Sequence, residues 1–294
     1  MRVFITGASG FIGAAVVREL VDVGHQVVAL ARSDSSAAAL RAAGLEVLRG
    51  ALEDLDVLRA GAADSAGVIH LAFDHDVSKF AESARVEALA LEALAAAIEG
   101  SERALVVSSG VLGLRTERDE SPPFPRKAGM QTALAYATRG VRVSFVRNAP
   151  FVHGPGDTHG FVPRLIALAR QKGVAGYAGD GTRRWPAVHR LDAARLYRLA
   201  LEKAPAGASV HAVGEEGVSL RAIAEHIGGH LNLPVASIAP SEVAPHFGEF
   251  FAMMFNRGDS PSSSTITRQL LGWEPTHAGI LDDIDEGHYF AAAR

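Results

Sequence analysis

The chain has 294 residues, of which 48% are hydrophobic and 21% charged, and its formal net charge is −4. This size allows one large or two modest domains, and the slight acidity provides no basic face of the kind that nucleic acids or membrane surfaces bind. The absence of cysteine excludes disulfides, thiolate-bound metals and cysteine nucleophiles. Because no stretch approaches the ~18 apolar residues of a membrane helix, we expect a cytoplasmic protein without nucleic-acid or membrane partners.

The first 150 residues alternate between strand-like and helix-like segments. Short apolar runs predict strands at 3–6, 25–31, 45–49, 67–72, 104–109 and 141–147. Helical patterns separate several of them, at 11–23, 35–43, 78–99 and about 125–139. Continuously apolar strands that alternate with helices are typical of a parallel sheet covered on both faces. With right-handed crossovers, these elements predict an α/β fold with a doubly wound parallel Rossmann sheet.

The pattern loosens after Pro150, where FVHGPGDTHG is rich in glycine and histidine. A helix at 191–203 and a strand at 210–214 follow. We therefore expect residues 1–150 to form the Rossmann domain, rejoined by a segment at about 186–214. Residues 151–185 and 215–294 would form a smaller α+β substrate lobe on its C-terminal side. Six phenylalanines and methionines between 247 and 255 are interpreted as core, with a substrate pocket or a dimer contact as alternatives.

A glycine-rich turn, TGASGFIG, lies between the first strand and the first helix. Its glycines, Gly7, Gly10 and Gly13, suit a tight turn, a close approach of backbone N–H groups to a pyrophosphate, and close helix–strand packing. The N-terminus of the following helix adds free N–H groups and a positive dipole end. The turn therefore predicts a dinucleotide site.

The end of the second predicted strand, VVALARSD, bears on which dinucleotide is bound. NAD-preferring folds usually place an acidic residue here, whereas this chain has Arg32 and Ser33. Arginine can pair with a 2′-phosphate and stack on adenine. We expect NADP, with NAD as the alternative, because Asp34 could act as a displaced ribose ligand and Arg32 could be a surface residue before a helix cap.

Five further motifs follow the glycine turn: VIHLAF, VVSSG, RNAPFVHGPGD, GDGTRRWPAVHRLDAARL and LGWEP. In this order they resemble the motifs of the extended and atypical short-chain dehydrogenase/reductases. These are the NAD(P)-dependent epimerase/dehydratase-like proteins. The resemblance covers nearly the whole chain. It implies a cofactor site made of Gly7, Gly10, Phe11, Ile12, Gly13, Leu52, Glu53, Leu71, Ala72, Phe73, Asn148, Ala149 and Pro150. The predicted site also includes Ser9 of the turn and Arg32 and Ser33 at the end of the second strand. It implies substrate contacts from Phe151, His153, Trp185 and Val188, for which ordinary packing is the alternative.

The catalytic residues of that family are a serine or threonine and a Tyr-x-x-x-Lys pair. Ser108 and Ser109 end the fifth predicted strand, where the hydroxyl residue belongs; Ser109 is preferred, although alignment on the following glycine favours Ser108. No tyrosine of this chain has a lysine four residues later. The resemblance instead places Arg126 at the tyrosine position and Met130 at the lysine position. Arginine is a poor general acid, but it can polarise a carbonyl or bind a carboxylate.

The missing pair makes an atypical NADPH-dependent reductase the preferred function. Its substrate would be a small, apolar carbonyl, enone or imine compound, with Ser109 orienting the oxygen and Ser108 and Arg126 as further catalytic candidates. Proton donors considered are Tyr136, His153, His70 and a water held by Ser109. The alternatives are a catalytically silent NAD(P)-binding redox sensor and an epimerase or dehydratase. We expect no metal, and a homodimer is the partner arrangement considered, although the sequence does not determine the oligomeric state.

Overall fold

A computed structural model describes residues 1–255 and 258–291. Its main sheet has seven parallel strands in the order β10-β6-β5-β4-β1-β2-β3. These strands are β1 (Arg2–Thr6), β2 (Gln26–Ala31), β3 (Glu46–Arg49), β4 (Gly67–His70), β5 (Ala104–Gly110), β6 (Arg142–Asn148) and β10 (Ser209–Ala212). The strand order reverses between β1 and β4, which is where doubly wound sheets open a crevice for ligands. The predicted doubly wound parallel sheet is confirmed.

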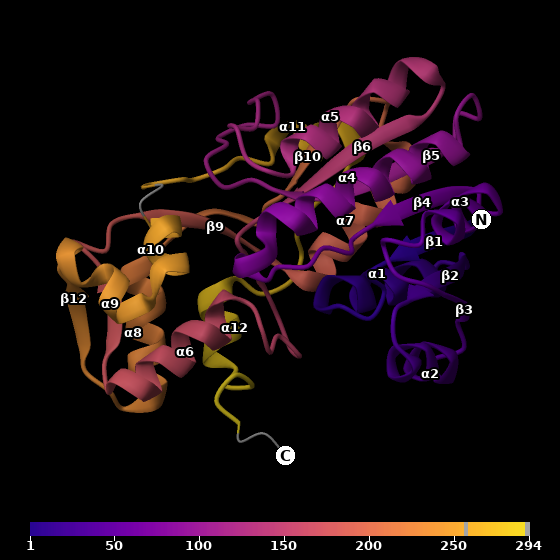
Figure 1. Ribbon diagram of the computed structural model, residues 1–294. Helices are drawn as coiled ribbons and strands as arrows, with labels where there is room; N and C mark the ends of the chain where they lie inside the picture. Colours follow the sequence, from indigo (N-terminus) through magenta and orange to yellow (C-terminus); the bar gives the residue numbers. More distant parts are fainter. Residues whose placement is uncertain (256–257, 292–294) are drawn as a thin grey trace.

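Helices cover both faces of this sheet (Figure 1). One face carries α1 (Phe11–Asp22), α2 (Asp34–Ala42) and α7 (Arg190–Lys203), and the other carries α3 (Leu55–Ala63), α4 (Phe80–Ala97) and α5 (Lys127–Ala135). Short 3-10 helices, η1 (Val77–Lys79) and η2 (Tyr136–Arg139), lie before α4 and after α5. The sequence pattern does not indicate α3, because the helix has only nine residues and contains Gly61, a poor helix former.

Alternation along β5 shows how the sequence assigns its side chains to the two faces. Ala104 and Val106 belong to the core beneath α1 and α7, whereas Leu105 and Val107 belong to the core beneath α3, α4 and α5. Successive strand residues point to opposite faces, so this alternation continues to the end of the strand. It therefore fixes which face each of the two serines after Val107 can reach.

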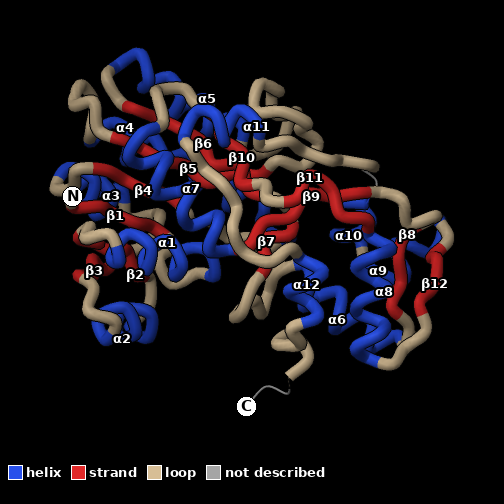
Figure 2. Tube along the Cα trace, turned by 180° about the vertical axis from the view of Figure 1, so that it is seen from behind, coloured by secondary structure: helices blue, strands red, loops and turns tan. Residues whose placement is uncertain are grey.

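The other elements form a second lobe, seen beside the main sheet in Figures 1 and 2. It contains a three-stranded sheet in the order β11-β9-β7 and a two-stranded sheet of β12 and β8. Its elements are β7 (Phe151–His153), α6 (Phe161–Lys172), β8 (Ala175–Ala178), β9 (Arg184–His189), β11 (Glu215–Ser219), α8 (Leu220–Leu231), β12 (Val235–Ile238), η3 (Pro240–Glu242), α9 (Val243–Phe247), α10 (Glu249–Phe255) and α12 (Ile280–Asp285). The domain boundaries drawn from the sequence stay a prediction.

The core of the second lobe is aromatic. Trp185 is fully buried, and its ring lies 5.7 Å from that of Phe151, 6.0 Å from Phe161 and 5.3 Å from Phe255. A cavity of about 20 Å³ beneath Phe247 and Phe255 has room for little more than a water molecule. The phenylalanines between 247 and 255 therefore pack as core, whereas Met253 is exposed.

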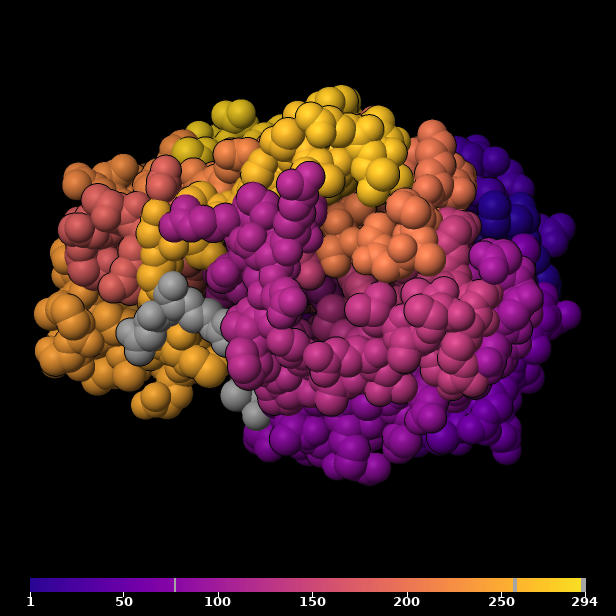
Figure 3. Space-filling model, turned by 90° about the horizontal axis from the view of Figure 1, so that it is seen from above, coloured from indigo at the N-terminus to yellow at the C-terminus, as the bar shows by residue number. Residues whose placement is uncertain are grey.

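The C-terminal part of the chain forms hydrogen bonds to the loop that follows β5. Residues 258–264 and the first residues of α11 (Thr265–Leu271) lie along residues 111–120, as Figure 3 shows from above. Ser260 Oγ accepts from Gly113 N at 2.7 Å, and buried Glu117 accepts from both the N and the Oγ1 of Thr267 at 2.7 Å.

The helices of the described residues include none with the length and apolar character of a membrane span.

Candidate active site

The glycine turn lies where β1 leads into α1, and its shape depends on missing side chains. Gly7 has φ +77°, and a Cβ there would lie 2.7 Å from Ala72 N. A Cβ on Gly13 would lie 2.0 Å from Gly7 O, and Gly10 is the N-cap of α1. The missing side chains therefore let the turn pack tightly on itself and on the chain after β4, and its position at the N-terminus of α1 fits a pyrophosphate.

Several other predicted cofactor residues lie at or just after the carboxyl ends of strands, along the same edge of the sheet. Leu71, Ala72 and Phe73 follow β4, Asn148 ends β6, and Leu52 and Glu53 follow β3. Because all seven strands are parallel, their carboxyl ends meet at one edge. Ser9 is exposed in the turn, Phe11 and Ile12 open α1, and Ala149 and Pro150 follow β6; their contacts with a cofactor stay predictions.

At the end of β2 the structure adds a second arginine to the one predicted. Arg32 and Ser33 are exposed, and Ser33 Oγ caps α2 by accepting from Ser36 N at 3.1 Å. Arg49, at the end of neighbouring β3, donates to Ala31 O at 2.7 Å and pairs with Asp34 at 3.0 Å. Arg49 was not predicted from the sequence, because its place beside Ala31 depends on the pairing of β3 with β2.

The two serines at the end of β5 face opposite sides of the sheet. Ser108 lies on the α1 and α7 side, where its Oγ accepts from Asn148 Nδ2 at 3.1 Å. By strand alternation Ser109 faces the α4 and α5 side, and its buried Oγ has no hydrogen-bond partner among the described residues. Ser109 therefore lies on the Arg126 side of the sheet with its hydroxyl uncommitted.

Tyr197 of α7 is a further polar residue near this strand end, and sequence reasoning gave it no role. Asn148 Nδ2 donates to its hydroxyl at 2.7 Å. Burial raises the pKa of Tyr197 to about 12, although Ser108 and Asn148 partly oppose the shift. Tyr197 is fully buried, and its hydroxyl shares the Asn148 amide with Ser108 Oγ.

Arg126 is the N-cap residue of α5 and pairs with Glu87 of α4. Its Nε and one terminal nitrogen, Nη2, donate to the two carboxylate oxygens at 2.7 and 2.5 Å. Nη2 also donates to Ser108 O at 2.8 Å, and the guanidinium carbon lies 4.2 Å above the centre of the Phe73 ring. The remaining nitrogen, Nη1, makes no hydrogen bond to the described residues. Met130, four residues on, is a buried residue of α5.

The carboxylate of Glu87 is itself buried and has a second neighbour. His70 Nε2 lies 3.7 Å from Glu87 Oε1, and His70 Nδ1 lies 2.8 Å from Thr6 Oγ1. Burial alone would raise the pKa of Glu87, but the nearby His70 and Arg126 outweigh it and lower the pKa. A buried anion thus keeps Arg126 in place at the edge where β4 and β5 end, and His70 is already committed to this network.

The four residues predicted to contact substrate are all buried. Phe151 and Val188 are 1% exposed, and His153 and Trp185 are fully buried. His153 Nδ1 lies 3.0 Å from Asp283 Oδ2, and the His153 ring lies edge-on to His189 at 5.5 Å. Packing is the role that these contacts show, and substrate contact stays a prediction.

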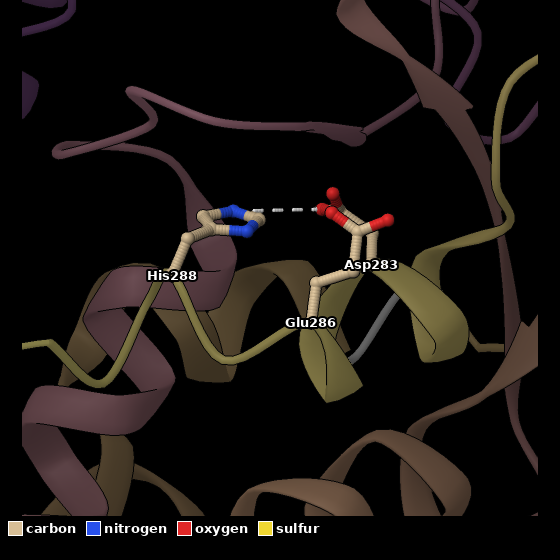
Figure 4. Close-up of side chains that lie close together, drawn as sticks. All are labelled: Asp283, Glu286 and His288. Carbon is tan, nitrogen blue, oxygen red and sulfur yellow. Dashed lines mark ion pairs between the residues drawn. The ribbon is translucent and has the colours of Figure 1, made fainter.

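Further histidines and carboxylates gather where α12 ends. Asp283, Glu286 and His288 have potential ligand atoms within 4.8 Å of one another (Figure 4). Asp283 is already paired with His153, and Glu286 is exposed. His189 accepts from Leu191 N as the cap of α7, and burial lowers the pKa of His189 to about 4. The pairing of Asp283 with His153 joins α12 to β7 within the second lobe, and we assign this cluster no ligand.

Residues 3–214 match the NAD dependent epimerase/dehydratase family. The chain belongs to that family. It is 47% identical over 298 residues to an uncharacterized protein of Schizosaccharomyces pombe, an alignment that covers 99% of this chain and 100% of the relative. It is 30% identical over 223 residues to the 4-hydroxy-2-methyl-3-oxo-4-farnesyl-3,4-dihydroquinoline-1-oxide ketoreductase of Stigmatella aurantiaca, covering 70% and 66% of the two chains. A solved structure, MoeE5 in complex with UDP-glucose and NAD, superposes with a TM-score of 0.75 at 24% identity, covering 97% and 96%.

Proposed function

We propose that the protein is an atypical NADPH-dependent reductase that converts a small, apolar carbonyl, enone or imine compound. The observation that carries the proposal is the uncommitted Nη1 of Arg126, next to a guanidinium edge fixed by Glu87 and Ser108. A fixed positive charge stabilises the negative charge that develops on an oxygen during reduction. Ser109, on the same side of the sheet, offers a second donor to that oxygen.

The cofactor would be held by the glycine turn and by the strand ends that follow β3, β4 and β6. When bound, a nicotinamide dinucleotide supplies hydride. Arg32 and Arg49 favour the 2′-phosphorylated form, because both side chains come from residues near the end of β2 and can pair with a phosphate. Arg49 is paired with Asp34, whereas Arg32 makes no ion pair with the described residues. The NAD in the MoeE5 complex supports the dinucleotide class and leaves NAD as the alternative.

The ketoreductase from Stigmatella aurantiaca supports carbonyl reduction. Epimerases and dehydratases begin by oxidising a sugar hydroxyl, which requires a strong base, and a guanidinium that stays protonated cannot serve as one. A silent nucleotide sensor is the second candidate, because Arg126 and Met130 replace the usual catalytic pair.

The test is the oxidation of NADPH, followed by its absorbance, with a panel of ketones, aldehydes, enones and imines. We expect turnover, and Ser109→Ala should lower kcat about 100-fold, the effect of losing one oxyanion donor, with little change in NADPH affinity. Tight NADPH binding without turnover of any compound would instead favour the sensor. An unchanged kcat would remove Ser109 from the mechanism.

A further inference from the structure

Reduction of a carbonyl needs a proton as well as hydride, and the usual donor is missing from this site. Arg126 stays protonated, so it is a poor acid. His70 is buried between Thr6 and Glu87, and His153 is buried against Asp283 in the second lobe. Tyr136 is buried and lies beneath the guanidinium of Arg139, at 4.1 Å. None of these groups combines access to water with a place beside Arg126.

His75 has both properties. It follows β4 in the loop before η1, and its residue is exposed. Its ring packs edge-on against Phe73 with the ring centres 5.0 Å apart, and the same Phe73 ring carries the guanidinium of Arg126 at 4.2 Å. The Phe73 ring therefore connects an exposed imidazole to the cation that replaces the usual tyrosine.

The charges around His75 come from both parts of the molecule. Arg126 and Glu87 act from the main sheet, Asp74 from the same loop, and Arg164 from α6 of the second lobe. Partial loss of water where the ring packs, together with Arg126 and Arg164, lowers the pKa of His75. His75 therefore lies within electrostatic range of arginines from both lobes.

We propose that His75 is the general acid of the reduction, a role that rests on the proposed function. The carbonyl carbon gains hydride, the electron pair of the C=O π bond moves to oxygen, and His75 transfers its proton to that oxygen to complete an alcohol. His75 is left neutral and regains a proton from water, to which it is exposed. Arg126 holds the oxygen and remains charged throughout.

Kinetics with NADPH and 9,10-phenanthrenequinone, a reactive diketone, test this role. Because a general acid acts in its protonated form, kcat of the wild type should fall about tenfold per pH unit above the pKa of His75. His75→Ala should lower kcat about 100-fold or more, lose this pH dependence and recover activity with added imidazole. The matched control is His230→Ala, an exposed histidine that stacks on Phe290 in the second lobe, and it should behave as wild type.

A second readout needs neither cofactor nor turnover. In the cofactor-free protein, the NMR titration of His75 should give a pKa below 6.5, and Arg126→Gln should raise it by removing the nearby positive charge. If Arg126→Gln does not fold, Arg164→Gln serves instead, because Arg164 is exposed and acts on the same ring. An unchanged titration of His75 in the folded variant would overturn the placement.

The kinetic outcomes separate the two proposals. Turnover by the wild type with an unaltered kcat and pH profile in His75→Ala would overturn the role of His75 alone. No turnover by the wild type with the diketone or with any compound of the panel would overturn the reductase function and the role of His75 with it.

Discussion

An arginine side chain is positively charged at physiological pH, and that of Arg126 is only 12% exposed, so its surroundings must supply a negative charge. Glu87 does so from the neighbouring helix with both carboxylate oxygens. Such a buried pair contributes little net stability compared with an apolar pair, but removing one partner alone is costly. Variants of Glu87 and Arg126 can therefore show whether the pair contributes to stability, to activity or to both.

Glu87→Gln should lower the free energy of unfolding by about 3–5 kcal/mol at neutral pH, because it leaves a buried guanidinium unpaired. The double variant Glu87→Leu with Arg126→Met should recover most of that stability while activity stays lost. Urea denaturation and NADPH oxidation measure the two effects. A double variant as unstable as Glu87→Gln would contradict this account.

The same pair gives stability a pH dependence of defined sign. The pKa of Glu87 in the folded protein is lower than its usual 4.5, so its contribution is complete above that value and is lost as pH falls through the folded pKa. The difference in unfolding free energy between wild type and Glu87→Gln should therefore shrink below about pH 4.5. A difference that stays constant from pH 7 to pH 4 would argue against an ionised Glu87.

The two arginines near β2 make the cofactor preference testable. Arg32→Ala and Arg49→Ala should each raise the KM for NADPH about tenfold, the effect of losing one charged hydrogen bond, and leave the KM for NADH unchanged. Steady-state kinetics with both cofactors measure this. Equal losses with NADPH and NADH would show that the arginines do not bind the 2′-phosphate.

At the scale of elements, the sequence predicts those strands and helices that a local pattern of apolar residues or glycines marks. The six expected strands of the first half and the glycine turn appear in place, because apolar runs and glycine spacing are local signals. The short helix α3 was missed because LDVLRAGAA carries only a brief helical pattern. Glu87, Arg49 and His75 were missed because their importance arises from contacts with Arg126, Asp34 and Phe73, far along the chain or in a loop.

The glycine turn allows a test of whether close backbone packing is needed for cofactor binding. Gly13→Ala should destabilise the protein by about 1–3 kcal/mol and weaken NADPH binding, because its Cβ would overlap Gly7 O. Gly229→Ala is the matched control, since it lies in α8 with nothing within 4 Å of the added atom. We expect that control to gain up to about 1 kcal/mol and to bind NADPH normally, as thermal unfolding and fluorescence titration would show.

At the scale of the whole molecule, the two parts are joined by continuous elements. Strand β9 belongs to the second lobe, and α7, which follows it directly, packs on the main sheet. Residues 258–267 return from the second lobe to hold the loop after β5. Loss of one part therefore removes packing partners from the other, and the molecule should unfold as one unit.

The two tryptophans report on this cooperativity, because each is fully buried in a different core. Trp185 lies in the second lobe, and Trp273 lies beneath α7, where its Nε1 donates to Asp192 O at 2.9 Å. In Trp185→Phe and in Trp273→Phe, the remaining fluorescence and the circular dichroism should lose their native values at the same urea concentration. NADPH at 100 times its Kd should then raise both unfolding free energies by about 2.7 kcal/mol, including that of the variant whose only tryptophan is in the second lobe. Fluorescence of Trp185 that changes before the circular dichroism would instead show a second lobe that unfolds alone, and NADPH would leave that first transition in place.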